Sequence, residues 1–339
     1  MADADLLGAP YTSETLELPD DYEGPVVSTL VHRPAAGIPL GGVLHLHGFC
    51  DYFFQTPQAD FFTAAGFDFY ALDLRKYGRS LLPHQTPNFC LDLAEYFPEL
   101  DQALSLIRNR DGHDRVIVTG HSTGGLIAAL WAAERRSSDS PVADALILNS
   151  PWLDLVGRFY IRTAGTEALN RLGQRRPYAV VPRTITGVYA ETLHSDYHGE
   201  WNYNFDWKPR ESFAVRAGWL RAVRLAHRAV HRGIDVGAPV LVLCSTASTA
   251  PQTWSEEATR TDTVLDVTQI AKWSHRLSRD VTVVRVEDAI HDVFCSRKEV
   301  REAAFGYVER WLPYALGGSP SSQLPDGDQS DEGHHASQH

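Results

Sequence analysis

A serine between two glycines carries the strongest chemical signal in the sequence. Residues 120–124 read Gly-His-Ser-Thr-Gly, with Ser122 at the centre. A serine hydroxyl is a weak nucleophile, so it attacks an acyl carbon only where a neighbouring base takes its proton. In a sharp strand-to-helix turn, this Gly-x-Ser-x-Gly arrangement lifts the hydroxyl clear of the sheet, and the small flanking residues let the turn close. We therefore predict that Ser122 is the nucleophile of an acyl-transfer reaction.

Two backbone N–H groups near Ser122 are predicted to hold the negative oxygen that forms during acyl transfer. The first belongs to Thr123, because an apolar helical run begins directly after the serine and a helix N-terminus carries partial positive charge. The second belongs to Phe49, because His47-Gly48-Phe49 follows an apolar strand-like run. Phe49 and Thr123 are thus the predicted oxyanion hole.

Two histidines in the same strand-like run could suggest a metal site. His45 and His47 alternate onto one face of the run, as a pair of metal ligands would. No third ligand is evident in the sequence. We therefore expect a structural role for both residues and predict no metal and no other cofactor.

A histidine late in the chain is placed to act as the base. His291 stands five residues beyond the strand-like run 281–286, and a helical pattern follows it. For a nucleophile at such a turn, the chain order is serine, acid, histidine, with the histidine in a loop after the last core strand. Among the 15 histidines of the chain, His291 is the one in this position. We predict that it is the catalytic base.

The acid has three candidates. It is expected after the strand-like run 239–244, but a polar segment intervenes before the next aspartates, Asp262 and Asp266. Asp262 precedes a short apolar pair and a helical pattern, and it is the favoured acid. Asp266 is the alternative acid, although it also suits the N-cap of that helix, where aspartate is common. Asp154, after the run 145–149, is a third candidate because some hydrolases take the acid from that strand.

Short apolar and β-branched runs alternate with helical patterns along the chain. This alternation predicts an α/β fold with a mostly parallel central sheet flanked by helices. The expected strands are residues 26–31, 42–47, 68–73, 115–119, 145–149, 239–244 and 281–286. The expected helices are about 92–110, 124–136, 267–277 and 297–312. The predicted oxyanion loop, nucleophile and base each follow one of these strands.

One interval breaks the alternation. Residues 151–237 contain no strand-like run, but they contain Arg-rich helical stretches and an aromatic cluster at 201–207. We interpret this interval as a mainly helical cap, inserted between the N-terminal part of the core at 1–150 and its C-terminal part at 238–315. The aromatic cluster either lines an acyl pocket or fills the interior of the cap. Residues 316–339 are polar without apolar periodicity, which predicts a disordered tail.

Charge and cysteine content restrict the partners and the compartment. The 339 residues include 43 acidic and 31 basic side chains, a formal net charge of −12. Such a field repels nucleic-acid phosphates and anionic membrane surfaces, so we expect neither as a partner. No run approaches the roughly 18 apolar residues of a membrane-spanning helix, and no secretion signal is evident. The four scattered cysteines suit reduced thiols, which predicts a cytoplasmic protein.

With these residues placed, the chain resembles the monoacylglycerol lipase and lysophospholipase-like branch of the α/β-hydrolases, which is sometimes grouped with the S33 serine aminopeptidases. The matching segments are 47–49, 73–80, 120–125, 262–266 and 291–294. The resemblance implies a Ser-His-Asp triad, a cap over an apolar acyl pocket and no cofactor. Three features depart from the family. Lys76-Tyr77 replace the usual Gly-His, Thr123 replaces Met, and the polar stretch before Asp262 is longer than usual.

These residues together predict hydrolysis of a carboxylic ester through an acyl-enzyme. Ser122 attacks the acyl carbon, His291 takes its proton, and Asp262 orients the imidazolium. The expected partner is a small, apolar acyl substrate, for which the resemblance suggests monoacylglycerols or lysophospholipids. A peptidase, a thioesterase or an acyltransferase would use the same triad and stays open. A non-catalytic binding protein on the same fold is the alternative from another class, and the complete serine, histidine and acid set argues against it.

Overall fold

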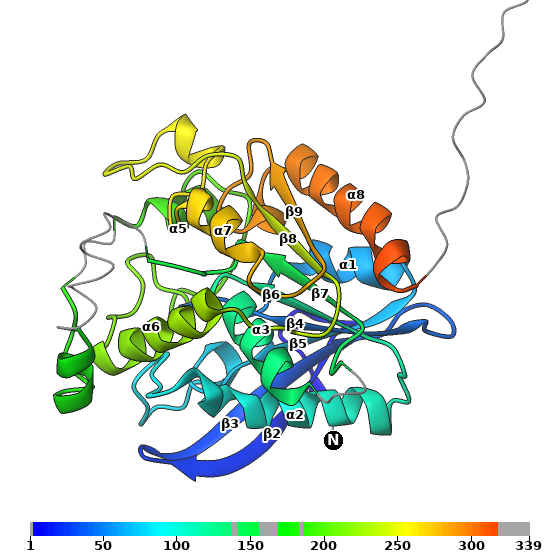
Figure 1. The fold of residues 1–339 in the computed structure, drawn as a ribbon, viewed down its shortest axis with the longest axis horizontal. Helices are drawn as coiled ribbons and strands as arrows, with labels where there is room; N and C mark the ends of the chain where they lie inside the picture. The colour runs from blue at the N-terminus through cyan, green and yellow to red at the C-terminus, as the bar shows by residue number, and fades with distance from the viewer. Residues whose placement is uncertain (1–2, 137–140, 156–168, 183–185, 318–339) are drawn as a thin grey trace, which may run out of the picture.

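A nine-stranded sheet forms the centre of the computed structural model, which describes residues 3–136, 141–155, 169–182 and 186–317 (Figure 1). The strands are β1 (Asp3–Ala4), β2 (Thr12–Asp21), β3 (Gly24–Arg33), β4 (Gly41–Leu46), β5 (Phe67–Asp73), β6 (Val116–His121), β7 (Ala145–Asn149), β8 (Val240–Ser245) and β9 (Val281–Val286). Their order in the sheet is β1-β2-β3-β5-β4-β6-β7-β8-β9. β4 to β9 pair in parallel, whereas β1, β2 and β3 form an antiparallel edge next to β5. The predicted mostly parallel sheet is confirmed.

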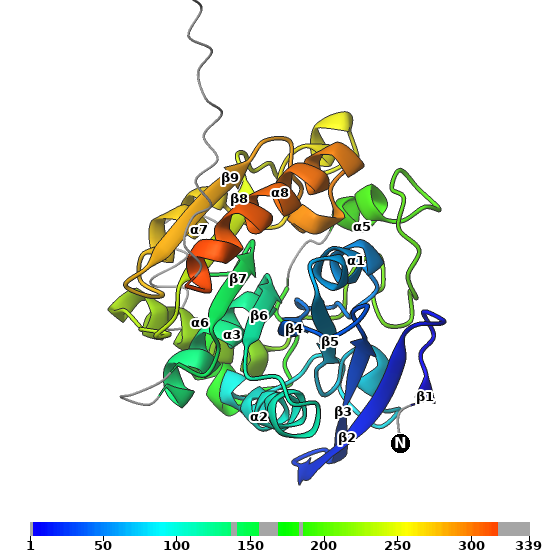
Figure 2. The same ribbon diagram turned by 90° about the vertical axis from the view of Figure 1, so that its right-hand side faces the viewer.

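Helices cover both faces of this sheet (Figure 2). The first face carries α1 (Thr56–Ala64) and α8 (Lys298–Ala315). The second carries α2 (Phe97–Ser105), α3 (Thr123–Arg135), α6 (Ala217–Arg232) and α7 (Val267–Ser274). Successive strand residues point to opposite faces, so Ile117 of β6 packs with the first set and Val118 with the second. Burial on both faces explains why the central strands are continuous apolar runs in the sequence.

The elements agree with the sequence patterns except where those patterns are weak. All seven expected strands are present, with ends within two residues of the expected ones. β2 was not expected because Leu16 is its one fully buried residue, so no apolar alternation marks it. α1 was not expected either. The helix expected at 92–110 is divided into η2 (Leu93–Tyr96), α2 and η3 (Leu106–Arg110). The division between η2 and α2 lies at Pro98, which cannot donate the N–H that would continue the preceding turn.

The parallel strands bring distant loops together at one edge of the sheet. In a parallel sheet the carboxyl ends of the strands lie on the same side, and ligand sites form there. The loop after β4 carries Phe49, and Ser122 directly follows β6. Asp262 and His291 follow β8 and β9. The predicted site residues therefore share one edge of the sheet.

The interval interpreted as a cap lies between β7 and β8. Its described part includes α5 (Val188–Leu193), α6 and a helical segment at 169–175, whereas 156–168 and 183–185 lie outside the described residues. The predicted disordered tail also lies outside them from residue 318 onward. Within the described ranges, no helix is long and apolar enough to cross a membrane.

A buried histidine on β4 makes stability depend on pH. His45 contacts the Thr119 hydroxyl at 2.8 Å, and burial lowers its pKa to about 3. In the unfolded chain the histidine takes up a proton below about pH 6.5. Between these values the unfolded state binds more protons than the folded state does. The free energy of unfolding is therefore expected to fall, as the pH is lowered, by up to about 1.4 kcal/mol for each pH unit. We expect His45→Gln to reduce the acid sensitivity of Tm between pH 7 and 4, measured by differential scanning calorimetry. An unchanged slope would contradict this account.

Candidate active site

The predicted nucleophile stands at a strained turn between β6 and α3. Ser122 has φ 52° and ψ −116°, values that a non-glycine residue adopts only when its surroundings hold it there. Its N–H donates to the Asn149 carbonyl at 2.9 Å, and its carbonyl accepts from the Trp152 N–H at 3.0 Å. The turn also requires a glycine at its end, because a Cβ on Gly124 would lie 2.2 Å from the His47 carbonyl oxygen. The tertiary structure therefore holds the serine in the geometry that the motif predicts.

The predicted base and the favoured acid are in direct contact. His291 Nδ1 lies 2.9 Å from Asp262 Oδ2, and both side chains are buried. The other carboxylate oxygen, Oδ1, accepts from the N–H groups of Val264 and Leu265 at 2.8 Å each. A carboxylate held by two backbone donors has one oxygen left to receive the proton of the imidazole Nδ1–H. This arrangement leaves Nε2 of His291 as the atom that can take a proton from a nucleophile.

The other two candidate acids are engaged elsewhere. Asp266 caps α7, since its carboxylate accepts from the Thr268 N–H at 2.9 Å and from the Thr268 hydroxyl at 2.6 Å. Asp154 pairs with Arg224 at 2.9 Å. Asp262 is therefore the candidate that the fold brings to His291.

The two predicted oxyanion donors come from separate elements. Thr123 is the first residue of α3, and Phe49 follows the Gly48 turn after β4. The two loops pack closely, because a Cβ on Gly48 would lie 3.2 Å from the Cβ of Ser122. His47 stabilises this turn. Its Nε2 accepts from the Leu74 N–H at 3.0 Å, so its Nδ1 carries the proton and donates to the Gly48 carbonyl at 2.8 Å.

The histidines of β4 are engaged in contacts within the protein. His45 contacts Thr119 and the amide of Gln58, and His47 supports the turn at Gly48. Across the part of the chain that the structure describes, no group of three or more His, Cys, Asp or Glu side chains could hold a metal ion. The positions of His45 and His47 agree with the structural role expected for them.

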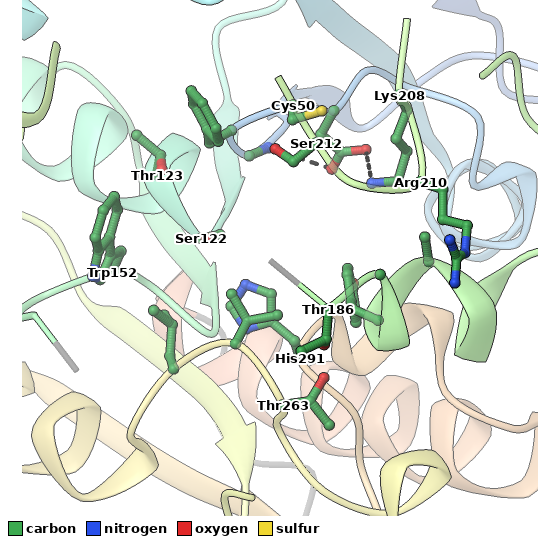
Figure 3. A pocket seen from close by; sticks show the side chains of 18 of the residues that line it. Cys50, Ser122, Thr123, Trp152, Thr186, Lys208, Arg210, Ser212, Thr263 and His291 are labelled. Carbon is green, nitrogen blue, oxygen red and sulfur yellow. Dashed lines mark hydrogen bonds and ion pairs between the residues drawn. The ribbon is translucent and has the colours of Figure 1, made fainter. Parts of the chain in front are cut away.

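Ser122 and His291 line one cavity of about 250 Å³ (Figure 3). In Figure 3, His291 and Thr263 lie on one side of the cavity, and Cys50, Ser212 and Lys208 lie on the opposite side. The apolar part of the lining includes Phe49, Trp152, Ala190, Pro209, Trp219, Pro251, Val264 and Leu265. The aromatic cluster at 201–207 lies outside this lining and packs with Tyr52 and Phe54 in a separate apolar cluster. These aromatics therefore fill the contact between the interval 151–237 and the loops after β4 and β9, a position that matches neither of the two roles considered for them.

A second carboxylate next to the base was not anticipated. Asp292 is buried and accepts from Asn149 Nδ2 at 2.6 Å and from Gln55 Nε2 at 3.1 Å. Burial alone would raise the pKa of Asp292, but the neighbouring His121 and these amide donors lower it well below its ordinary range. The amides of Asn149 and Gln55 thus fix the loop that carries His291. The sequence offered one signal, an acidic residue directly after the predicted base.

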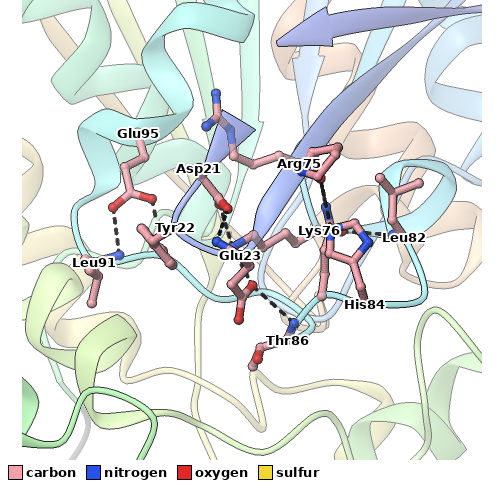
Figure 4. A network of polar contacts seen from close by, with 12 residues as sticks. Asp21, Tyr22, Glu23, Arg75, Lys76, Leu82, His84, Thr86, Leu91 and Glu95 are labelled. Atoms are coloured by element: carbon pink, nitrogen blue, oxygen red, sulfur yellow. Dashed lines mark hydrogen bonds and ion pairs between the residues drawn. The ribbon is translucent and has the colours of Figure 1, made fainter. Parts of the chain in front are cut away.

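Lys76, a departure from the family pattern, forms a buried ion-pair network (Figure 4). The residue has φ 66°, a left-handed backbone conformation in which glycine is favoured. Its ammonium is fully buried and lies 2.6 Å from the carboxylates of both Asp21 and Glu23 on β2 and its turn. The ring of the following residue, Tyr77, lies 4.9 Å from that of His47. The network therefore holds the β2–β3 edge against the loop that backs the predicted oxyanion turn.

Sheet topology and site geometry together define the class of this protein. A largely parallel sheet, a serine at the turn after β6, an aspartate after β8 and a histidine after β9 are the features of an α/β-hydrolase. The profile of the family described as "Serine aminopeptidase, S33" matches residues 37–297. The chain belongs to this family, which confirms the resemblance found in the sequence.

Solved structures of lipases and esterases share the fold. A soluble variant of monoglyceride lipase from Saccharomyces cerevisiae, in complex with a substrate analogue, superposes with a TM-score of 0.65 at 16% identity, covering 89% of this chain and 95% of that one. The monoacylglycerol lipase of Paleococcus ferrophilus gives 0.60 at 17% identity, with 84% and 99% covered. A thermostable carboxyl esterase from Bacillus coagulans, in complex with glycerol, gives 0.62 at 13% identity, with 90% and 99% covered. No curated protein sequence matches the chain.

Proposed function

We propose that this protein is a serine hydrolase that cleaves a carboxylic ester through an acyl-enzyme. The observation that carries the proposal is the buried contact between His291 and Asp262, together with one cavity that both His291 and the strained Ser122 line. A serine at such a turn, a histidine able to take its proton and a carboxylate that orients the histidine form the catalytic unit of many hydrolases. The aromatic and aliphatic lining of the cavity favours an apolar acyl group.

The geometry supports a two-step reaction. Ser122 Oγ attacks the carbonyl carbon while His291 Nε2 takes the hydroxyl proton, and the carbonyl oxygen becomes an oxyanion held by the N–H groups of Phe49 and Thr123. The C–O bond to the alcohol then breaks, and the alcohol leaves with the proton from His291. Water, deprotonated by the same histidine, attacks the acyl carbon; the bond to Ser122 Oγ breaks, His291 returns the proton to Oγ, and the carboxylic acid leaves. The Asp262 carboxylate stabilises the imidazolium in both steps.

The location proposed for this activity is the cytoplasm. The four cysteines, Cys50, Cys90, Cys244 and Cys295, are free thiols in buried positions. Free thiols are typical of a reducing compartment.

A substrate series tests the proposed reaction. We expect the protein to hydrolyse p-nitrophenyl esters from acetate to long acyl chains with one optimum of kcat/KM, because the cavity has a fixed size. The matching p-nitroanilides are expected to react much more slowly, and release of p-nitrophenol or p-nitroaniline reports both rates. Preference for the anilides would favour a peptidase, and inertness toward every ester, together with no labelling by a fluorophosphonate, would favour a non-catalytic binding protein.

A further inference from the structure

The loop that carries the predicted oxyanion donor Phe49 is docked along its length on the cap. The Tyr52 hydroxyl accepts from the Asn204 N–H at 2.7 Å, and the rings of Phe54 and Tyr203 lie 5.0 Å apart. Between these contacts and the donor, Asp51 pairs with Lys208 at 2.6 Å. Residues 51–54 after β4 therefore contact residues 203–208 of the cap loop at three positions along its length.

The ion pair is the buried polar part of this contact. Asp51 and Lys208 are 3% and 8% exposed, and the Lys208 ammonium lies 5.5 to 5.8 Å from the ring centres of Phe54, Tyr189 and Tyr203. Burial alone would raise the pKa of Asp51, but Lys208 holds it below its ordinary value, and Asp51 likewise raises the pKa of Lys208. Both groups are therefore charged at neutral pH. A buried charge that loses its partner is strongly destabilised, so each residue depends on the other.

The same carboxylate reaches back to the oxyanion turn. Asp51 Oδ2 lies 3.5 Å from the backbone nitrogen of Gly48, the residue before Phe49. Cys50, between Phe49 and Asp51, has φ 52°, a conformation that a non-glycine residue keeps only where its neighbours hold it. The direction of the Phe49 N–H thus depends on a strained peptide segment that Asp51 holds from one end.

We propose that Asp51 and Lys208 are positioning residues, which couple the cap to the oxyanion hole by fixing the turn that carries the Phe49 N–H. This inference rests on the ester hydrolysis proposed above. Neither residue transfers a proton or forms a bond with the substrate. Their loss misplaces a donor that acts mainly in the transition state, so it lowers kcat more than it raises KM.

The test is a double-mutant cycle on the full chain. Asp51→Asn and Lys208→Met are each expected to lower kcat about 10- to 100-fold, up to the effect of losing one oxyanion donor, with KM within about twofold of the wild type. The double variant is expected to be no slower than the slower single variant, because it leaves no unpaired charge. Affinity for an aryl trifluoromethyl ketone, whose serine adduct carries an oxyanion, should fall in parallel with kcat/KM. Arg135→Met controls for the removal of a paired cation away from the cavity: Arg135, on the last turn of α3, forms a partly exposed ion pair with Asp101 of α2, and the variant is expected to keep wild-type kcat.

Two results would contradict the inference that Asp51 and Lys208 position the oxyanion turn. A rise in KM with unchanged kcat would mean that the pair binds substrate directly. A lower Tm with unchanged kcat per fluorophosphonate-reactive site would mean that the pair only stabilises the fold. If Lys208→Met does not fold, Asp51→Asn, which keeps the size of the side chain, provides the same measurement. A wild type inert toward esters would overturn the proposed function itself, whereas an active wild type with unaffected variants would overturn only this inference.

Discussion

Ser122→Ala is expected to lower kcat for ester hydrolysis by about 10⁴-fold or more and to abolish labelling by a fluorophosphonate. The substitution removes the only atom that forms the covalent bond in the proposed reaction. Alanine tolerates φ 52° about as well as serine does, so the fold is expected to persist. Circular dichroism and Tm check the fold, and initial rates with the best p-nitrophenyl ester check the activity.

Ser150→Ala is a closely matched control for this prediction. Ser150 is likewise a buried serine with positive φ, 45°, and its hydroxyl makes no hydrogen bond to the residues that the structure describes. We expect Ser150→Ala to keep both activity and labelling. Retention of activity in Ser122→Ala would assign the nucleophile to another residue, and unlabelled wild-type protein would support the binding-protein alternative.

The second large effect is expected at the acid. Asp262→Asn should lower kcat about 10³- to 10⁴-fold, because an amide donates where the carboxylate accepts and so favours the wrong tautomer of His291. Asp266→Asn should leave kcat unchanged, since asparagine caps a helix as well as aspartate does. The two variants make the same chemical change, four residues apart, and rates per fluorophosphonate-reactive site compare them directly. Equal losses in both variants, or a loss in Asp266→Asn alone, would contradict the assignment of the acid.

Local patterns were sufficient for most of the fold. The central strands are buried on both faces, so they are continuous apolar runs that a sequence displays directly. β2 was not predicted, because this exposed strand buries only Leu16 and has no continuous apolar run. Pro98 marks the division between η2 and α2 within the helical pattern at 92–110, and that signal was available in the sequence.

The sequence predicted those parts of the site that neighbouring residues form, but not those that depend on contacts between distant segments. The motif at Ser122 is local and visible in the sequence, although the structure shows that Gly120 is required by atoms within the turn and Gly124 by the carbonyl groups of Leu46 and His47 on the neighbouring strand and loop. The choice among Asp262, Asp266 and Asp154 stayed open in the sequence, since each follows a strand or precedes a helix in a plausible position. The contacts of their carboxylates distinguish the three in the structure.

The sequence by itself determined seven of the strands and their order along the chain, the Gly-x-Ser-x-Gly motif at Ser122 and the family, because periodicity and turn chemistry act over a few neighbouring residues. Only the tertiary structure decided which aspartate contacts His291, 29 residues further along the chain, and that Lys208 contacts Asp51, 157 residues earlier. These contacts depend on the order of the strands in the sheet and on the position of the loop 201–208 against the segment after β4. No local pattern encodes the distance between two such segments, because that distance arises from the packing of the whole chain.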